Sequence, residues 1–134
     1  MPQSAADAPT FGGAIPIIRI FDVDRAKAFY VDHLAFVIEW EHRFGDDFPL
    51  YAQISRGGLT LHLSEHAGDA TPGATVFIWI TGLDALHAEL TAKGSKAHID
   101  DGPGDFRVLQ VWDPFSNRVR FAERNPPRDG PAPA

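Results

Sequence analysis

The sequence has 134 residues, a formal net charge of −6 at pH 7, 12 Lys and Arg residues and no cysteine. The lack of thiols excludes disulfides, cysteine-ligated metal and thiolate catalysis, and the few scattered basic residues argue against a nucleic-acid-binding surface. No apolar run reaches the roughly 18 residues that span a bilayer, and the N-terminus lacks the pattern of a signal peptide. We therefore expect a cytoplasmic protein that binds neither membranes nor nucleic acid.

The two ends of the chain differ in composition from its middle. Residues 1–12 and 125–134 are rich in Pro, Ala and Gly and have no apolar periodicity, which predicts flexible tails. Residues 13–124 are long enough for one domain with its own hydrophobic core. Within them, residues 14–65 and 74–123 show the same order of predicted elements, at an offset of about 60 residues.

The first half begins with the apolar run AIPIIRIF, residues 14–21, which predicts a strand. Asp22 follows and is a residue type that caps helix N-termini. Apolar residues then recur at helical spacing through DRAKAFYVDHLAF. Three segments with a strand-like pattern come next, at residues 37–44, 49–55 and 59–65. Gly57-Gly58 predicts a hairpin turn between the last two, so the predicted order is βαβββ.

The second half repeats this order. Residues 74–80, ATVFIWI, predict a strand, and LDALHAELTAKG predicts a helix that ends at Gly94. Three further predicted strands follow, at residues 95–99, 107–113 and 118–123. The segment from Pro114 to Asn117 provides the turn between the last two.

A duplicated βαβββ unit predicts an α+β fold. We expect two tandem modules that form a curled mixed sheet around a cleft, with the helices on the convex side. Because side chains alternate along a strand, each strand should direct apolar residues to the helices and polar residues to the cleft. The predicted helix-facing residues are Leu59, Leu61, Leu63, Val119 and Phe121. The predicted cleft-facing residues are Thr60, His62, Ser64, Arg118 and Arg120.

The segment LTLHLSEHAGD contains His62, Glu65 and His66 in the order H-x-x-E-H. This motif holds zinc only on a helix, where residues four apart share a face. The period-two alternation around His62 predicts a strand instead. The two remaining interpretations are that His62 lines the cleft while Glu65 and His66 begin a loop, or that His62, His66 and His42 form an unusual metal site.

Three stretches resemble the vicinal oxygen chelate, or glyoxalase, superfamily, which includes ring-cleaving dioxygenases and bleomycin-resistance proteins. IRIFDVDRAKAFYVDHLAF resembles its opening, and DPFSNRVRFAE is similar to its closing D-P-x-G-N signature, with Ser116 in place of the usual Gly. The segment from Leu59 to Leu90 is most similar to the bleomycin-resistance branch. The resemblance covers about residues 14–123 and implies the same two-module fold.

The resemblance also implies where a metal would be held. Metal-using members place one ligand on the cleft side of the first and last strand of each module. The matching positions are Ile15, His62, Thr75 and Arg120. Ile15 has no donor atom and Arg120 is a fixed cation, which leaves far fewer ligands than a catalytic divalent ion needs. We therefore expect no metal and no other cofactor.

By the same resemblance, the protein is expected to bind and sequester an antibiotic or metabolite in clefts of a homodimer. The candidate ligand-binding residues are His42, Gln53, His62, Trp79, Gln110, Trp112 and Arg120. The two tryptophans would stack on a small planar ligand, and the other side chains would orient it. The acidic net charge favours a cationic ligand, whereas Arg120 favours a ligand with an acidic or carbonyl group.

The alternative is an enzyme. A lyase, isomerase or dioxygenase of the glyoxalase superfamily would use His62 with the unusual metal site, or His62 as a general base beside Arg120. We expect binding without catalysis, because the four superfamily positions contain a single histidine.

Overall fold

The computed structural model describes residues 8–126 and confirms the two βαβββ modules. The elements of the first module are β1 (Ile17–Arg19), α1 (Val23–Lys27), η1 (Ala28–His33), β2 (Val37–His42), β3 (Tyr51–Arg56) and β4 (Leu59–Ser64). Those of the second module are β5 (Thr75–Trp79), α2 (Leu83–Ala92), β6 (Ile99–Asp101), β7 (Phe106–Trp112) and β8 (Arg118–Arg124). No helix in residues 8–126 is long and apolar enough to cross a membrane.

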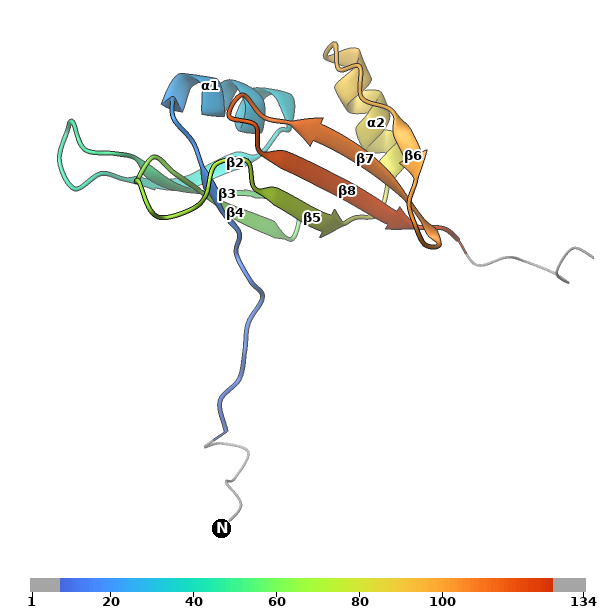
Figure 1. Ribbon diagram of the computed structural model, residues 1–134, viewed down its shortest axis with the longest axis horizontal. Helices are drawn as coiled ribbons and strands as arrows, with labels where there is room; N and C mark the ends of the chain where they lie inside the picture. Colours follow the sequence, from blue (N-terminus) through green and yellow to red (C-terminus); the bar gives the residue numbers. More distant parts are fainter. Residues whose placement is uncertain (1–7, 127–134) are drawn as a thin grey trace, which may run out of the picture.

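Each module forms its own four-stranded mixed sheet. The first sheet has the order β1-β4-β3-β2 and the second has the order β5-β8-β7-β6. The first strand of each module pairs in parallel with the last, and the other neighbours are antiparallel. Both helices lie on the same side of the two sheets, which run side by side (Figure 1). The open face of each sheet is the one that points away from the helices.

A local signal fixes the start of α1 and another fixes the end of α2. Oδ1 of Asp22 accepts a hydrogen bond from the Arg25 backbone N–H at 2.9 Å, so the predicted N-cap is confirmed. The helical turn continues from α1 into η1, a π-helix of six residues. At the end of α2, Gly94 has a φ of +94° and Ser95 N–H donates to the Leu90 carbonyl. A residue without a Cβ adopts this left-handed conformation at little cost, which explains why the helix stops there.

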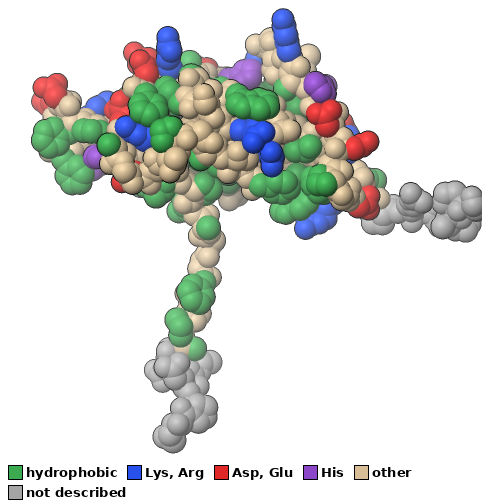
Figure 2. All heavy atoms as spheres, in the orientation of Figure 1, with side chains coloured by type: hydrophobic (Ala, Val, Ile, Leu, Met, Phe, Trp, Pro, Cys, Tyr) green, Lys and Arg blue, Asp and Glu red, His purple; other side chains and the backbone are tan. Residues whose placement is uncertain are grey.

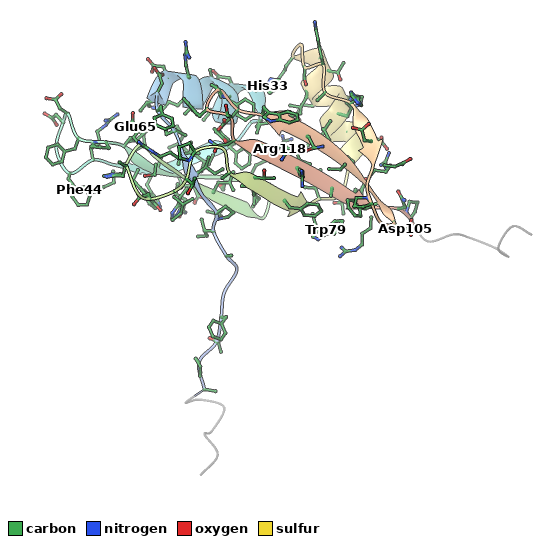
Figure 3. The ribbon with its side chains drawn as sticks, viewed as in Figure 1. His33, Phe44, Glu65, Trp79, Asp105 and Arg118 are labelled. Carbon is green, nitrogen blue, oxygen red and sulfur yellow. The ribbon has the colours of Figure 1, made fainter. Side chains whose placement is uncertain are left out.

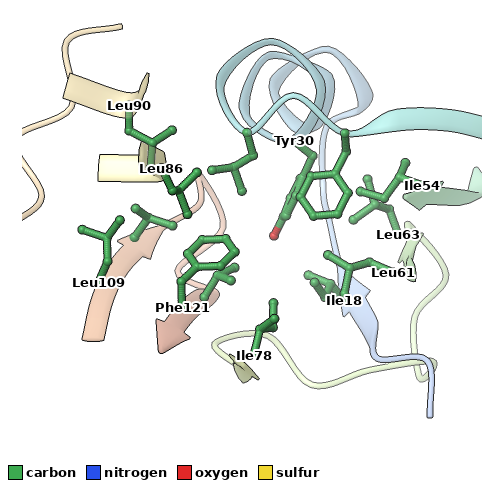
Figure 4. Close-up of a cluster of buried hydrophobic side chains, with 14 of the residues drawn as sticks. Ile18, Tyr30, Ile54, Leu61, Leu63, Ile78, Leu86, Leu90, Leu109 and Phe121 are labelled. Carbon is green, nitrogen blue, oxygen red and sulfur yellow. The ribbon is translucent and has the colours of Figure 1, made fainter. Parts of the chain in front are cut away.

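One hydrophobic core lies between the helices and both sheets (Figure 4). The predicted helix-facing residues belong to it, because Leu61, Leu63, Val119 and Phe121 are buried in the cluster and Leu59 packs against it. Tyr30 of η1 is fully buried in this core, between residues of the two modules. The helices therefore join two sheets that are not hydrogen-bonded to each other.

The expected strand at residues 95–99 is the clearest error in the element assignment. The strand begins only at Ile99, because Ser95 to His98 form a loop in which Ser95 Oγ accepts a hydrogen bond from Ala97 N–H. The expected strand at residues 14–21 is also shorter, since only Ile17–Arg19 are assigned as strand. Residues 8–16 contain no helix or strand; the Pro16 carbonyl accepts a hydrogen bond from His62 N–H, and the segment before it extends away from the sheets (Figure 1). Of the expected tails, residues 1–7 and 127–134 lie outside the described residues.

The turn from Asp113 to Asn117, in the second module, is hydrogen-bonded to residues of the first module. Asp113 Oδ2 accepts hydrogen bonds from the Tyr30 hydroxyl at 2.7 Å and from Asn117 Nδ2 at 2.8 Å. Asn117 Nδ2 also donates to the Arg19 carbonyl of β1. Asp113 and Asn117 are both almost fully buried, and each is hydrogen-bonded, as buried polar groups must be. The D-P-x-x-N segment therefore has a structural role at the junction of the modules.

Candidate functional site

The open face of the first sheet carries a row of polar and aromatic side chains. Strand register places Ile17, His62, Gln53 and Trp40 side by side on neighbouring strands. The core, on the other face of the sheet, contains their neighbours along each strand: Ile18 next to Ile17, Leu61 next to His62 and Ile54 next to Gln53. This alternation confirms that His62 faces away from the helices.

His62 is held by hydrogen bonds at both ring nitrogens. Its Nε2 lies 2.8 Å from Gln53 Oε1, and its Nδ1 lies 2.6 Å from the Tyr51 hydroxyl. Because the carboxamide oxygen only accepts, Nε2 donates to Gln53, and the Tyr51 hydroxyl is the partner of Nδ1. Burial and the nearby Asp69 raise the pKa of Tyr51, which keeps that hydroxyl protonated. The two partners therefore fix the orientation of the imidazole ring.

His42 belongs to a different part of the same sheet. It lines a hollow of about 450 Å³ together with Trp40, Phe44, Tyr51, His66 and Asp69. The Phe44 ring contacts His42 edge-on at 4.7 Å and His66 at 6.1 Å between centroids. Within residues 8–126, no three His, Asp or Glu side chains come together in an arrangement that could hold a metal ion.

The H-x-x-E-H segment has the structure of a strand followed by a turn. Ser64 ends β4, and its hydroxyl accepts a hydrogen bond from His66 N–H. Glu65 Oε1 accepts a hydrogen bond from Leu50 N–H at 2.9 Å and lies 3.8 Å from Arg43. Glu65 thus ties the loop between β2 and β3 to the end of β4. The expectation that Glu65 and His66 begin a loop is confirmed by this geometry.

The second sheet repeats the arrangement of the first with different chemistry. Register places Phe77, Arg120 and Gln110 side by side, as it does Ile17, His62 and Gln53 in the first sheet. Gln110 Oε1 accepts a hydrogen bond from Arg120 Nε at 3.0 Å, as Gln53 Oε1 does from His62. The same Gln110 oxygen also accepts from Arg118 Nη1 at 3.3 Å. One neutral side chain therefore orients two guanidinium groups.

Both candidate tryptophans lie on the open face of the second sheet and are largely solvent-accessible. Trp112 is 57% exposed, and the Arg118 guanidinium lies 5.4 Å from its ring centroid. Trp79 is 45% exposed and contacts Phe77 and Phe106 edge-on, while Arg124 lies over its ring at 4.0 Å. Figure 3 shows Trp79 and Arg118 on the second sheet, far from Phe44 at the other end of the molecule.

The structure separates the predicted site residues into two groups rather than bringing them into one pocket of a single chain. His42, Gln53 and His62 lie on the first sheet, and the rest lie on the second. Gln110 and Trp112 help to line a hollow of about 440 Å³ beside the loop before β6. Trp79 lines a separate hollow of about 700 Å³ between the β3–β4 hairpin and α2.

The residues directly opposite His62 and Arg120 in strand register are Ile17 and Phe77, each two residues beyond the superfamily positions Ile15 and Thr75. Neither Ile17 nor Phe77 has a side-chain donor atom for a metal. Two aromatic residues beside His62, Tyr51 and Trp40, were not predicted from the sequence. Tyr51 is the first residue of β3. The face that Trp40 occupies could not be counted along β2, because the register shifts between Ile38 and Trp40.

A family model described as "Glyoxalase superfamily protein" matches residues 4–128, so the chain belongs to the glyoxalase superfamily. Solved structures with the same fold include TioX from Micromonospora sp. ML1, with a TM-score of 0.66, 19% identity, and coverage of 87% of this chain and 99% of that one. TnmS3, an antibiotic binding protein from Streptomyces sp. CB03234, has a TM-score of 0.65, 19% identity, and coverage of 87% and 100%.

A glyoxalase/bleomycin resistance protein from Streptomyces sp. CB03234 has a TM-score of 0.64 and 22% identity, and the match covers 82% of this chain and 98% of that one. At these identities the likeness concerns the fold. No curated protein matches the sequence.

Proposed function

We propose that the protein binds and sequesters a small planar molecule, such as an antibiotic or metabolite, without altering it chemically. The observation that carries the proposal is the exposure of Trp112 and Trp79 on the same sheet face as the hydrogen-bonded Arg120 and Gln110. Solvent-exposed aromatic rings beside a few oriented polar groups are typical of sites for planar ligands. One neighbour in fold, TnmS3, is described as an antibiotic binding protein.

The proposed binding unit is a homodimer. The open faces expose the large apolar side chains Ile17, Trp40, Phe77, Trp79 and Trp112. Hydrophobic side chains gather on the surface over the strands of the second module, next to basic side chains (Figure 2). Exposed apolar groups on a sheet face favour association, and a second copy would place the first sheet of one chain opposite the second sheet of the other. Sedimentation equilibrium tests this, and a monomer at micromolar concentration would contradict it.

Ligand binding is tested by titrating a panel of planar antibiotics and metabolites and following tryptophan fluorescence. A binding ligand should quench the emission saturably, and Trp112→Leu should weaken its affinity by roughly 10-fold or more because a stacking surface is lost. Phe48→Leu, at an exposed aromatic residue of the β2–β3 loop, is the control and should leave affinity unchanged. Recovery of the unaltered ligand by mass spectrometry tests the lack of turnover.

A second candidate function is catalysis with His62 as a general base. It is favoured by the hydrogen bonds that His62 makes with Tyr51 and Gln53, which fix the orientation of the imidazole on the open face. Conversion of a bound ligand by the wild-type protein, with loss of conversion but retained affinity in His62→Gln, would establish this function and overturn the first.

A further inference from the structure

We infer that the ligand is a planar aromatic acid, whose carboxylate binds the Arg120 guanidinium on the open face of the second sheet while its ring packs against Trp112. This inference rests on the proposed binding function and names the chemical class of the ligand. The inferred ligand is an anion, whereas the net charge of the whole chain favours a cationic ligand.

The basic residues of this face are not neutralised by acidic side chains. Among the described residues, no carboxylate lies within 4.0 Å of Arg118, Arg120 or Arg124, whereas Arg43, Arg56 and Arg107 each have such a partner elsewhere. Asp100, which register places on the same face, lies on the edge strand β6, where its Oδ1 is 3.2 Å from His98 Nε2. An acidic protein therefore concentrates positive charge on one of its sheet faces.

Neutral acceptors hold these guanidinium groups in place without cancelling their charge. Gln110 Oε1 accepts from both Arg118 and Arg120, and Thr75 Oγ1 lies 3.4 Å from Nε and Nη2 of Arg118. Arg120 uses only its Nε in this way, and no residue between 8 and 126 accepts a hydrogen bond from its Nη1 or Nη2. These two atoms are free to bind a carboxylate in the bidentate geometry that guanidinium groups favour.

Aromatic surface lies at a suitable spacing from this charge. Trp112 pairs with Arg118 across β7 and β8, and Gln110 pairs with Arg120. Trp112 is thus a diagonal neighbour of Arg120, and the Cα atoms of such neighbours on an antiparallel sheet are about 7 Å apart. On the other side, Phe77 is directly opposite Arg120 and is 44% exposed. A fused ring that carries a carboxylate spans such a distance, so both contacts can form at once.

The face that would lie opposite in the proposed dimer adds no competing acid at its centre. The central row of the first sheet consists of Ile17, His62, Gln53 and Trp40. Glu39 and Glu41 flank Trp40 along β2, and Glu41 pairs with Lys27. Asp69 is beyond the end of β4 and accepts a hydrogen bond from Ser64. A cleft between the two faces would therefore stay positively charged and partly shielded from water, which strengthens the attraction for an anion.

The experiment is calorimetric titration of the full chain with three probes of one shape: 2-naphthoate, 2-naphthamide and 2-naphthylmethylammonium. We expect the wild type to bind naphthoate about 10-fold more tightly than the neutral amide, and the cation most weakly. Arg120→Gln should abolish the preference for the acid and leave affinity for the amide within about 2-fold. Raising the salt concentration should weaken binding of naphthoate and not of the amide.

Arg25→Gln is the matched control, because it removes one positive charge from the exposed surface of α1, on the opposite side of the molecule from the open faces. It should keep the preference for the acid. Equal loss of preference in both variants would mean that net charge alone selects the acid, and would overturn the inference. So would equal or tighter binding of the amide or the cation by the wild type.

The two proposals fail in different ways. If the amide binds, Trp112→Leu weakens its binding and naphthoate shows no advantage, the binding function stands and the acid inference falls. If none of the three probes binds at concentrations up to about 1 mM, both fall, because even a contact worth about 4 kcal/mol would be visible there. Thermal unfolding of each variant establishes that it is folded.

Discussion

The Tyr30 hydroxyl donates a 2.7 Å hydrogen bond to Oδ2 of Asp113, a residue 83 positions away and in the other module. Both residues are buried, and Asp113 also accepts hydrogen bonds from the backbone N–H groups of Phe115 and Asn117. This contact ties the helical segment of the first module to the turn before β8.

Tyr30→Phe should destabilise the protein by about 1.5–3 kcal/mol. The substitution removes the hydroxyl that donates to a charged, buried acceptor and leaves the ring in place. Urea denaturation followed by circular dichroism measures the change. Tyr51→Phe, which removes a half-buried hydroxyl at the sheet surface, should cost less. An equal or smaller loss in Tyr30→Phe would contradict the structural role of the junction.

Stability should fall in alkaline solution, and Tyr30 should account for much of the fall. Burial, followed by the Asp113 charge and hydrogen bond, raises the pKa of Tyr30 far above its usual 10.0. The unfolded chain loses this proton above pH 10 while the folded chain keeps it, so the stability present below that pH is lost as pH rises. The slope is about 1.4 kcal/mol per pH unit for this residue. Urea midpoints measured from pH 8 to 11 should decline less steeply in Tyr30→Phe than in the wild type.

Ser116→Gly should stabilise the protein by about 0.5–1 kcal/mol. Ser116 has a φ of +67°, in the left-handed region, where a Cβ costs roughly 1–2 kcal/mol. Glycine removes that strain but loses some of the gain to its greater entropy in the unfolded chain. Thermal unfolding checks the result. Gly57→Ser, at a φ of +58° in the hairpin turn, introduces the reverse change and should destabilise.

Glu123→Gln should destabilise α2 in neutral solution but not in acid. The Glu123 carboxylate accepts hydrogen bonds from Gly82 and Leu83 N–H at the start of α2 and contacts Arg107. The two backbone bonds, and then Arg107, lower the pKa of Glu123 below its usual 4.5. Its contribution is therefore present above pH 4.5 and is lost as pH falls through the lowered pKa. The stability gap between wild type and variant should close in that range, whereas exposed Glu39→Gln should show no such gap.

Gln110→Met should weaken binding of naphthoate by about 3- to 10-fold. Methionine fills a similar volume but provides no strong acceptor, so Arg118 and Arg120 lose the group that orients them. Calorimetric titration measures the change. Gln53→Met is the matched variant at the equivalent position of the first sheet and should affect binding of the acid less. Equal losses in the two variants would contradict a specific role for Gln110.

The sequence by itself determined the two-module fold and the direction of most strand side chains. Period-two alternation placed His62 and Arg120 opposite the core because a strand has only two faces. Asp22 and Gly94 marked helix ends because their effect depends on the nearest turn of backbone. The loop before β6 was misassigned because strand pairing, rather than local propensity, decides where so short a strand begins.

Only the tertiary structure decided how residues from different strands meet. Register between β1 and β4, and between β5 and β8, placed Ile17 and Phe77 opposite His62 and Arg120, and no local signal fixes such a pairing across distant segments. The bond from Tyr30 to Asp113 and the sharing of Gln110 by two arginines also depend on long-range packing. The sequence shows which polar and charged side chains a site can contain. Which of them form hydrogen bonds, and which charges remain unpaired, depends on the distances between chain segments in the folded protein.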